Sequence, residues 1–200
     1  MPFLSYEDPL PARPQRVLVA GTSGSGKTTL AGRIGDALQV PHTEIDALFH
    51  GPGWTPRPEF EADVRRLAAT PAWVVEWQYA QVRPLLGQRA DLVVWLDLSR
   101  GLVLRQVALR TLRRRLNRRP LWNGNLEPPL WTLLTDPQHV VRWAWTTHPG
   151  GTLRITALAG QRPDLPVVRL GSRAAVGRWL AGPLQRAAAA AAQPHPVSRP

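Results

Sequence analysis

A glycine-rich segment at residues 21–28, Gly-Thr-Ser-Gly-Ser-Gly-Lys-Thr, constrains the fold of this 200-residue chain more than any other feature. It fills every required position of the Walker A pattern. The segment before it, Arg16 to Ala20 (RVLVA), is β-branched and apolar, and Thr28 to Leu38 after it has apolar residues at helical spacing. The order of strand, glycine loop and helix predicts a phosphate-binding loop at the end of a buried strand.

The chemistry of this loop follows from its residue types. Glycines let the chain fold into a concave nest of N–H groups, and the helix that begins beside Lys27 adds the positive end of its dipole. Lys27 is the only lysine among 25 basic residues, and a compact ammonium suits a tight phosphate nest. We expect Lys27 to reach the β and γ phosphates of ATP and the Thr28 hydroxyl to ligate Mg²⁺. The predicted nucleotide-binding residues are Gly21, Thr22, Ser23, Gly24, Ser25, Gly26, Lys27, Thr28 and Thr29.

Composition limits where and on what such a protein acts. There is no cysteine, which excludes disulfides, thiolate metal sites and a thiol nucleophile and suits a reducing cytoplasm. The longest apolar runs are strand-sized and residues 1–14 do not read as a signal peptide, so we expect a cytoplasmic protein without a membrane segment. The net charge of +11 favours a polyanion such as DNA, but the arginine-rich coding of a GC-rich genome gives the same charge without selection for binding.

Strand and helix patterns alternate along most of the chain. Trp73 to Glu76 and Leu92 to Leu96 are continuous apolar runs, which are typical of strands buried on both faces of a parallel sheet. The other predicted segments are a strand at Thr43 to Ile45, helices at Glu59 to Ala69 and about Gly101 to Leu116, an irregular stretch from Asn117 to Asp136, a Trp-rich helix near Gln138 to Thr147, and a last strand and helix within Val167 to Leu180.

This alternation predicts a doubly wound α/β domain, a P-loop three-layer sandwich, at residues 15–183. Residues 1–14 are expected to form an N-terminal extension. Residues 184–200, rich in alanine and proline, are expected to form a disordered tail because they offer little apolar surface to offset the ordering entropy.

Motor, translocase and GTPase domains are usually longer, and they would need a Walker B strand that ends in Asp together with sensor or base-recognition elements, a combination that is not apparent here. Further motifs favour a small kinase instead. They are Asp46-Ala47-Leu48-Phe49, Pro52-Gly53-Trp54, Tyr79 with Val82-Arg83, the run from Arg89 to Asp97, an arginine-rich helix, and Leu121-Trp122-Asn123-Gly124-Asn125 with Glu127. With the P-loop, they give the chain from Val17 to about Leu180 a resemblance to the adenylate-kinase-like P-loop family often labelled DNA topology modulation protein (FlaR type). The resemblance implies phosphoryl transfer and a nucleotide-kinase-like, five-stranded parallel sheet with a mobile, arginine-rich lid at about residues 113–136.

Acidic residues after the predicted second and third strands are candidates for the acceptor side. Glu44 and Asp46, two apart on a strand, would point to the same side at its carboxyl end. Small kinases that the chain resembles place an acid there, so Asp46 is the candidate to contact or deprotonate the acceptor; the alternative is an acid that caps the next turn. Where the family has Asp-Gly-Asn, this chain has Glu76-Trp77-Gln78, which keeps a carboxylate for Mg²⁺ waters but replaces a glycine with tryptophan.

The same resemblance assigns residues to the acceptor and to the metal. Tyr79 belongs to the acceptor site, and Arg83 is the candidate to hold an acceptor phosphate or carboxylate, with an exposed helix charge as the alternative. Asp97 would orient Mg²⁺ waters or cap the helix that follows Ser99.

Eight arginines lie between Arg100 and Arg119, on an amphipathic helix that runs into the lid. The family pattern selects Arg110, Arg115 and Arg119 as catalytic residues that neutralise charge in the transition state. Arg173, after the last strand, lies where the resemblance places adenine.

Together these features predict a P-loop kinase that transfers the γ-phosphoryl group of ATP, with Mg²⁺, to a small acceptor, for which a nucleotide or nucleoside is the leading class. One alternative is a kinase of another small hydroxyl metabolite or an antibiotic. A second is an ATP-binding regulator that acts on DNA topology, for which binding should fall steeply with salt. The acceptor and the oligomeric state are left open.

Overall fold

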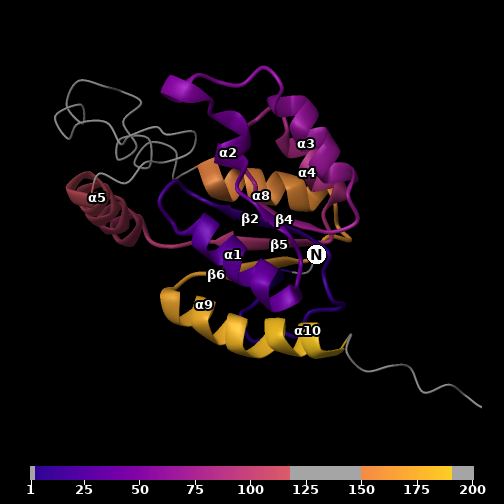
Figure 1. Cartoon of the computed structure of the whole chain (residues 1–200). Coiled ribbons are helices and arrows are strands. Elements are labelled where there is room, and N and C mark those ends of the chain that lie inside the picture. The colour runs from indigo at the N-terminus through magenta and orange to yellow at the C-terminus, as the bar shows by residue number, and fades with distance from the viewer. Residues whose placement is uncertain (1–2, 118–149, 191–200) are drawn as a thin grey trace, which may run out of the picture.

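A parallel β-sheet with helices on both faces forms the centre of the molecule (Figure 1). The computed structural model describes residues 3–117 and 150–190, without the side chains of residue 108 and residues 110–117. The strands are β1 (Phe3–Leu4), β2 (Arg16–Gly21), β3 (His42–Thr43), β4 (Trp73–Glu76), β5 (Leu92–Leu96) and β6 (Val167–Leu170). Their order is β1-β6-β5-β2-β4-β3, and the paired strands run parallel. The predicted fold class is confirmed.

The described sheet has six strands rather than the expected five, because the N-terminus adds one. Phe3 and Leu4 pair with Val167 and Val168 of β6, so part of the predicted extension is the edge strand β1. The continuous apolar runs behave as predicted: every residue of β4 and β5 is buried.

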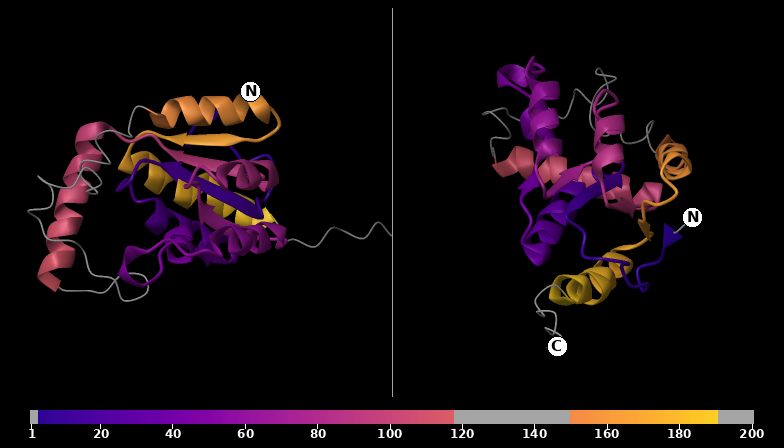
Figure 2. Two further views of the ribbon diagram at one scale, coloured as in Figure 1. Left: turned by 90° about the horizontal axis from the view of Figure 1, so that it is seen from above. Right: turned by 90° about the vertical axis from the view of Figure 1, so that its right-hand side faces the viewer.

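One face of the sheet is covered by α1 (Lys27–Leu38) and by a C-terminal helical segment. That segment consists of α9 (Arg173–Trp179), a π-helical turn at Leu180–Leu184, and α10 (Gln185–Ala190). Helix α5 (Arg100–Asn117) lies across the end of the sheet at which β2 and β5 finish, and its Val103 and Val107 join the same core (Figures 1 and 2).

The opposite face is covered by shorter helices and by α8. These are α2 (Ile45–Phe49), a 3₁₀ turn at Pro52–Trp54, α3 (Phe60–Ala69), α4 (Arg83–Arg89) and α8 (Gly150–Gln161). Their apolar residues pack with the alternate set of strand residues, such as Leu18, Val75 and Val93. The sheet is therefore the middle of three layers.

The strand order reverses around β2. The chain leaves β2 through α1 to reach β3 and β4 on one side, and later returns to place β5 on the other side. In open α/β sheets, ligands bind at the carboxyl ends of the strands where the order reverses. That point is the end of β2 at Gly21, where the glycine-rich segment begins.

Two predicted boundaries differ from the structure. The strand expected at Thr43 to Ile45 ends at Thr43, and Ile45 instead begins α2, because the Ile45 N–H bonds the Glu76 side chain rather than a neighbouring strand. At the C-terminus the chain is helical through Ala190, and Leu184 is fully buried against the core, so the folded part extends past residue 183.

Several predictions fall on residues outside those described. They are the irregular stretch from residue 117 to 136, the lid at about residues 113–136 apart from the backbone of α5, the Trp-rich helix at residues 138–147, and the tail beyond residue 190. No helix within residues 3–117 and 150–190 combines the length and apolar character that crossing a membrane requires.

Candidate functional site

The Gly21–Thr28 segment folds as a loop between β2 and α1. Gly24 and Gly26 have φ angles of 78° and 98°, a left-handed backbone that residues with a Cβ rarely adopt. Gly26 is the N-terminal cap of α1, and it has no side chain with which to cap the N–H groups of the first turn. The N–H groups of a helix's first turn and the positive end of its dipole attract anions, so the loop is suited to bind one.

Helix α5 packs directly on the loop. A Cβ at Gly24 would lie 1.9 Å from Cγ2 of Val107, and a Cβ at Gly21 would lie 2.7 Å from Ser25 Oγ and 3.1 Å from Leu96 Cβ. The loop is therefore held between the end of β5 and α5, with no space for side chains at these two positions.

Lys27 is 7% exposed, and its ammonium donates a hydrogen bond to the Thr22 carbonyl at 3.0 Å. Its charge thus lies within the loop rather than in solvent. Thr28 is half-buried next to it, Ser25 is buried, and Thr29 is exposed on α1. The structure gathers the predicted nucleotide-binding residues at one helix terminus, with Thr29 at its outer side.

Asp46 lies in the first turn of α2 and is held by two residues that follow β4. Its Oδ1 accepts a hydrogen bond from Gln78 Nε2 at 2.9 Å and one from the Tyr79 hydroxyl at 2.6 Å. Among the described residues, no other donor reaches its side chain. Asp46 is therefore a fixed carboxylate with Oδ2 left to accept a further bond, on a helix rather than on the predicted strand.

Tyr79 is fixed by its backbone and by aromatic neighbours. Its φ of 58° is rare for a residue with a side chain, and its ring stacks on Phe49 at 4.1 Å and meets Phe60 edge-on at 5.1 Å. Burial and the neighbouring Asp46 carboxylate raise the pKa of the Tyr79 hydroxyl, so it stays protonated and donates to Asp46. The His50 ring also lies within hydrogen-bond distance of this hydroxyl, at 3.3 Å.

Glu76, at the end of β4, is 2% exposed and links β4 to β3 and to α2. Its Oε2 accepts from the Ile45 N–H at 3.0 Å, and its Oε1 lies 3.3 Å from Nε2 of His42 on β3. Burial alone raises the pKa of this carboxyl, but the hydrogen bonds from His42 and Ile45 outweigh it and leave the pKa below its ordinary 4.5. Glu76 is therefore an ionised carboxylate at neutral pH, and it positions α2 and hence Asp46.

The acidic residues and the P-loop share one edge of the sheet. Glu76 pairs in register with Val19, two residues before Gly21, and the Trp77 N–H bonds the Val19 carbonyl at 2.9 Å. The segment that carries Gln78 and Tyr79 therefore starts beside the end of β2. The structure brings the predicted residues Lys27, Asp46, Glu76 and Tyr79 to the same end of the molecule.

The remaining predicted residues whose side chains are described are Asp97, Arg83 and Arg173. Asp97 forms an ion pair with Arg169, with Oδ2 2.6 Å and 2.8 Å from two guanidinium nitrogens, and its role at a metal stays a prediction. Arg83, the first residue of α4, lies over the Trp77 ring with its Cζ 6.0 Å from the centroid. Arg173 is exposed at the start of α9.

The predicted catalytic arginines are only partly described. Arg110 and Arg115 belong to α5, where only their backbone is described. Their side chains, and all of Arg119, lie outside the described part of the chain. Their catalytic roles stay predictions.

Two residues of the site were not assigned from the sequence. Gln78 was noted only as a departure from the family pattern, yet it is one of the donors that hold Asp46. His42 was not assigned, yet it pairs with Glu76. The signal for Gln78 was its place directly after a buried strand at the binding edge, whereas nothing in the sequence pairs His42 with a residue 34 positions away.

A magnesium ion brought by a nucleotide needs few protein ligands, because Mg²⁺ keeps several waters. Among the described residues there is no cluster of three His, Asp or Glu side chains that could hold a metal on its own. The Thr28 hydroxyl beside Lys27 suits such an ion, and the Glu76 oxygens, which already accept protein hydrogen bonds, suit contact through water only.

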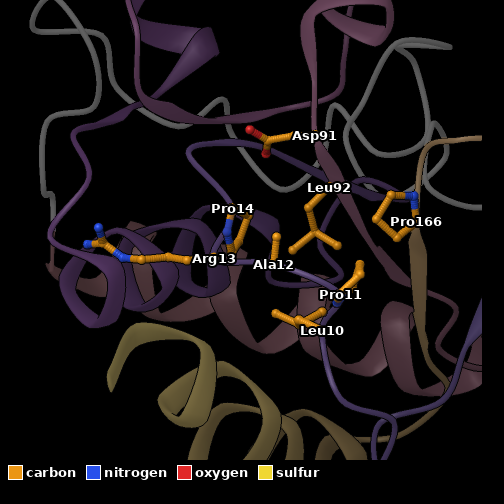
Figure 3. A pocket seen from close by; sticks show the side chains of 8 residues that line it. All are labelled: Leu10, Pro11, Ala12, Arg13, Pro14, Asp91, Leu92 and Pro166. Atoms are coloured by element: carbon orange, nitrogen blue, oxygen red, sulfur yellow. The ribbon is translucent and has the colours of Figure 1, made fainter. Parts of the chain in front are cut away.

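A pocket elsewhere in the molecule lies at the opposite end of the sheet (Figure 3). It is lined by Leu10, Pro11, Ala12, Arg13, Pro14, Asp91, Leu92 and Pro166. Its Asp91 accepts from the N–H groups of Gln15 and Arg16, and its Arg13 donates to the Leu38 carbonyl. Its charged groups therefore bind the chain itself, and we assign it no ligand.

No protein-family model matches the sequence, and no curated protein matches it. Similar solved structures include a gluconokinase from Sinorhizobium meliloti 1021, at 21% identity over 92% of this chain and 99% of that chain, with a TM-score of 0.49. A shikimate kinase from Bacteroides thetaiotaomicron aligns at 13% identity over 84% of this chain and 95% of its own, with a TM-score of 0.44. A sugar kinase from Janibacter sp. HTCC2649 aligns at 20% identity over 90% and 92%, with a TM-score of 0.39. Likeness at this level carries no argument about activity.

Gly24→Ala should disrupt the loop. The added methyl group meets Val107 and the φ of Gly24 disfavours any Cβ, so we expect the free energy of unfolding to fall by about 2–4 kcal/mol in urea titrations. Gly101→Ala on α5 is the matched control, because a Cβ there meets nothing within 4 Å. Equal stability of the two variants would contradict the described packing of α5 on the loop.

Glu76→Gln should lower the free energy of unfolding at pH 7 by about 2 kcal/mol, because a neutral amide replaces a buried, charged acceptor. Since the folded carboxyl has a pKa below 4.5, its contribution is present above that pH and is lost as the pH falls through the folded pKa. The difference between wild type and variant in urea unfolding should therefore narrow below about pH 4.5. The control is Glu61→Gln, which changes an exposed pair on α3. A difference that does not depend on pH would refute the charged role of Glu76.

Proposed function

We propose that this chain is an ATP-dependent phosphotransferase that moves the γ-phosphoryl group of Mg-ATP to a small acceptor, with a nucleotide or nucleoside as the leading class. The observation that carries the proposal is the fixed Asp46 carboxylate at the sheet edge that also carries the P-loop. A nucleotide-binding loop alone fits many activities, whereas a second, oriented carboxylate gives an acceptor hydroxyl a place to bind.

In the proposed phosphoryl transfer, the loop and Lys27 act on the phosphates of ATP, and other residues act on Mg²⁺. The loop N–H groups and Lys27 bind and orient the phosphates, and phosphoryl transfer depends mainly on such positioning and on charge stabilisation. Mg²⁺, when bound, neutralises charge on the β and γ phosphates, with the Thr28 hydroxyl and water on Glu76 as the groups that would hold it.

Asp46 orients the acceptor and takes up its proton. Tyr79 and Gln78 both bond Oδ1, so Oδ2 is the atom that accepts the hydrogen bond of the acceptor hydroxyl. The Tyr79 ring, which stacks on Phe49, gives this carboxylate an aromatic neighbour. In the proposed mechanism, Arg110, Arg115 and Arg119 add the positive charge that stabilises the transition state, as the resemblance to adenylate-kinase-like proteins implies.

Release of ADP from Mg-ATP, measured against a panel of nucleoside monophosphates, nucleosides and other small hydroxyl compounds, tests the proposal. We expect one acceptor class to stimulate release strongly in the wild type. Lys27→Ala should abolish the stimulation, and Asp46→Asn should lower kcat by about 10²-fold or more, because the carboxylate that orients the hydroxyl is lost.

Arg33→Gln on the exposed side of α1 is the control and should leave turnover unchanged. Full turnover in Lys27→Ala would contradict the mechanism. No stimulation by any compound would instead favour the alternative of an ATP-binding regulator of DNA, whose DNA affinity should fall steeply with salt.

A further inference from the structure

The Tyr79 hydroxyl lies between the Asp46 carboxylate and the ring of His50. Its oxygen is 2.6 Å from Asp46 Oδ1 and 3.3 Å from His50 Nε2. His50 directly follows α2, and its backbone N–H donates to the Asp46 carbonyl at 3.0 Å. The three side chains therefore form one series of polar groups, which ends at the carboxylate proposed to bind the acceptor.

The His50 ring is held in place by two aromatic neighbours. It meets the Phe49 ring edge-on at 4.9 Å and the Trp54 ring edge-on at 5.1 Å. Trp54 has a φ angle of 61°, which is rare for a residue with a side chain, and the turn that carries it is closed by a hydrogen bond of 2.7 Å from the Gly51 N–H to the Thr55 carbonyl. Backbone strain of this kind costs free energy, and here it places an aromatic ring against His50.

Among the described residues, the single proton of the Tyr79 hydroxyl has two possible acceptors, Asp46 and His50. A neutral histidine ring carries a proton on one nitrogen and a lone pair on the other. A lone pair on Nε2 would compete with Asp46 for the hydroxyl proton. A proton on Nε2 would instead be donated to the hydroxyl oxygen, and the Tyr79 proton would go to Asp46 alone. The two tautomers of His50 therefore have opposite effects on Asp46.

We propose that His50 donates a hydrogen bond from Nε2 to the Tyr79 hydroxyl and so directs the hydroxyl proton to Oδ1 of Asp46. The inference rests on the proposed function and adds a positioning residue to it. With Oδ1 held in this way, Oδ2 stays available to take up the proton of the acceptor hydroxyl as the new O–P bond forms. His50 acts through Tyr79 and does not need to contact the substrate.

The tautomer of His50 tests the direction of this hydrogen bond without any turnover. Nuclear magnetic resonance of the isotope-labelled full chain at alkaline pH shows which ring nitrogen carries the proton. His50→Gln identifies the signals of this ring among those of the five histidines. We expect the proton on Nε2 in the wild type, and a lone pair on Nε2 would overturn the inference.

Two substitutions separate hydrogen bonding from packing. His50→Gln keeps an amide N–H near the position of Nε2 and loses the aromatic ring, whereas His50→Phe keeps a ring against Phe49 and Trp54 and loses the donor. In the ADP-release assay, we expect His50→Phe to lower kcat by about fivefold with an unchanged KM for ATP, and His50→Gln to stay within about twofold of the wild type. Stability in urea should rank the two variants the other way. Equal kcat values for the two variants would overturn the inference.

A double-mutant cycle with Tyr79→Phe tests whether His50 acts through the Tyr79 hydroxyl. Without that hydroxyl there is no proton to direct, so His50→Phe should cause no further loss of kcat in the Tyr79→Phe protein. The control background is Arg33→Gln on the exposed side of α1, in which the full effect of His50→Phe should persist. The same loss from His50→Phe in both backgrounds would contradict the proposed route.

The two proposals fail separately. If no acceptor stimulates ADP release, the phosphotransferase proposal fails, and the tautomer of His50 alone then decides the direction of the hydrogen bond. If an acceptor is phosphorylated but Nε2 of His50 carries a lone pair, the role of His50 fails and the phosphotransferase proposal stands.

Discussion

The close packing of the Gly21–Thr28 loop against α5 is the constraint on which the candidate site is built. No side chain fits at Gly24, where a Cβ would lie 1.9 Å from Val107. The packing of α5 therefore restricts the loop between the end of β2 and the start of α1. In the observed conformation the Lys27 ammonium bonds the Thr22 carbonyl within the loop, at the N-terminal end of α1, so the fold itself forms the loop on which the proposed phosphate site depends.

The proposed acceptor side depends on a buried charge, that of Glu76. The Glu76 carboxylate binds the N–H that starts α2, which places Asp46, and Gln78 and Tyr79 then fix the Asp46 carboxylate from the loop after β4. The strained backbone of Tyr79 belongs to this loop too, and Arg83, which lies over the Trp77 ring, begins α4 directly after it. Strain and buried charge cost stability, and they collect at sites where the chain must hold polar groups ready.

The sequence predicted those elements that are determined by residues next to one another in the chain. The glycine loop, β4 and β5 were predicted closely because a phosphate nest needs glycine and a strand buried on both faces needs a continuous apolar run. Contacts between distant residues could not be predicted. Ile45 leaves its expected strand because of a carboxylate 31 residues away, and α4 lies against α8 although the sequence predicted neither helix.

Equilibrium binding of Mg-ATP to the wild type and to Lys27→Ala, followed by titration calorimetry, tests the central claim most directly. The account predicts one site per chain in the wild type and an affinity at least about tenfold weaker in the variant, because a buried ammonium no longer faces the phosphates. Equal affinity in both proteins would contradict it, since nucleotide would then bind somewhere other than the loop on which the whole site is built.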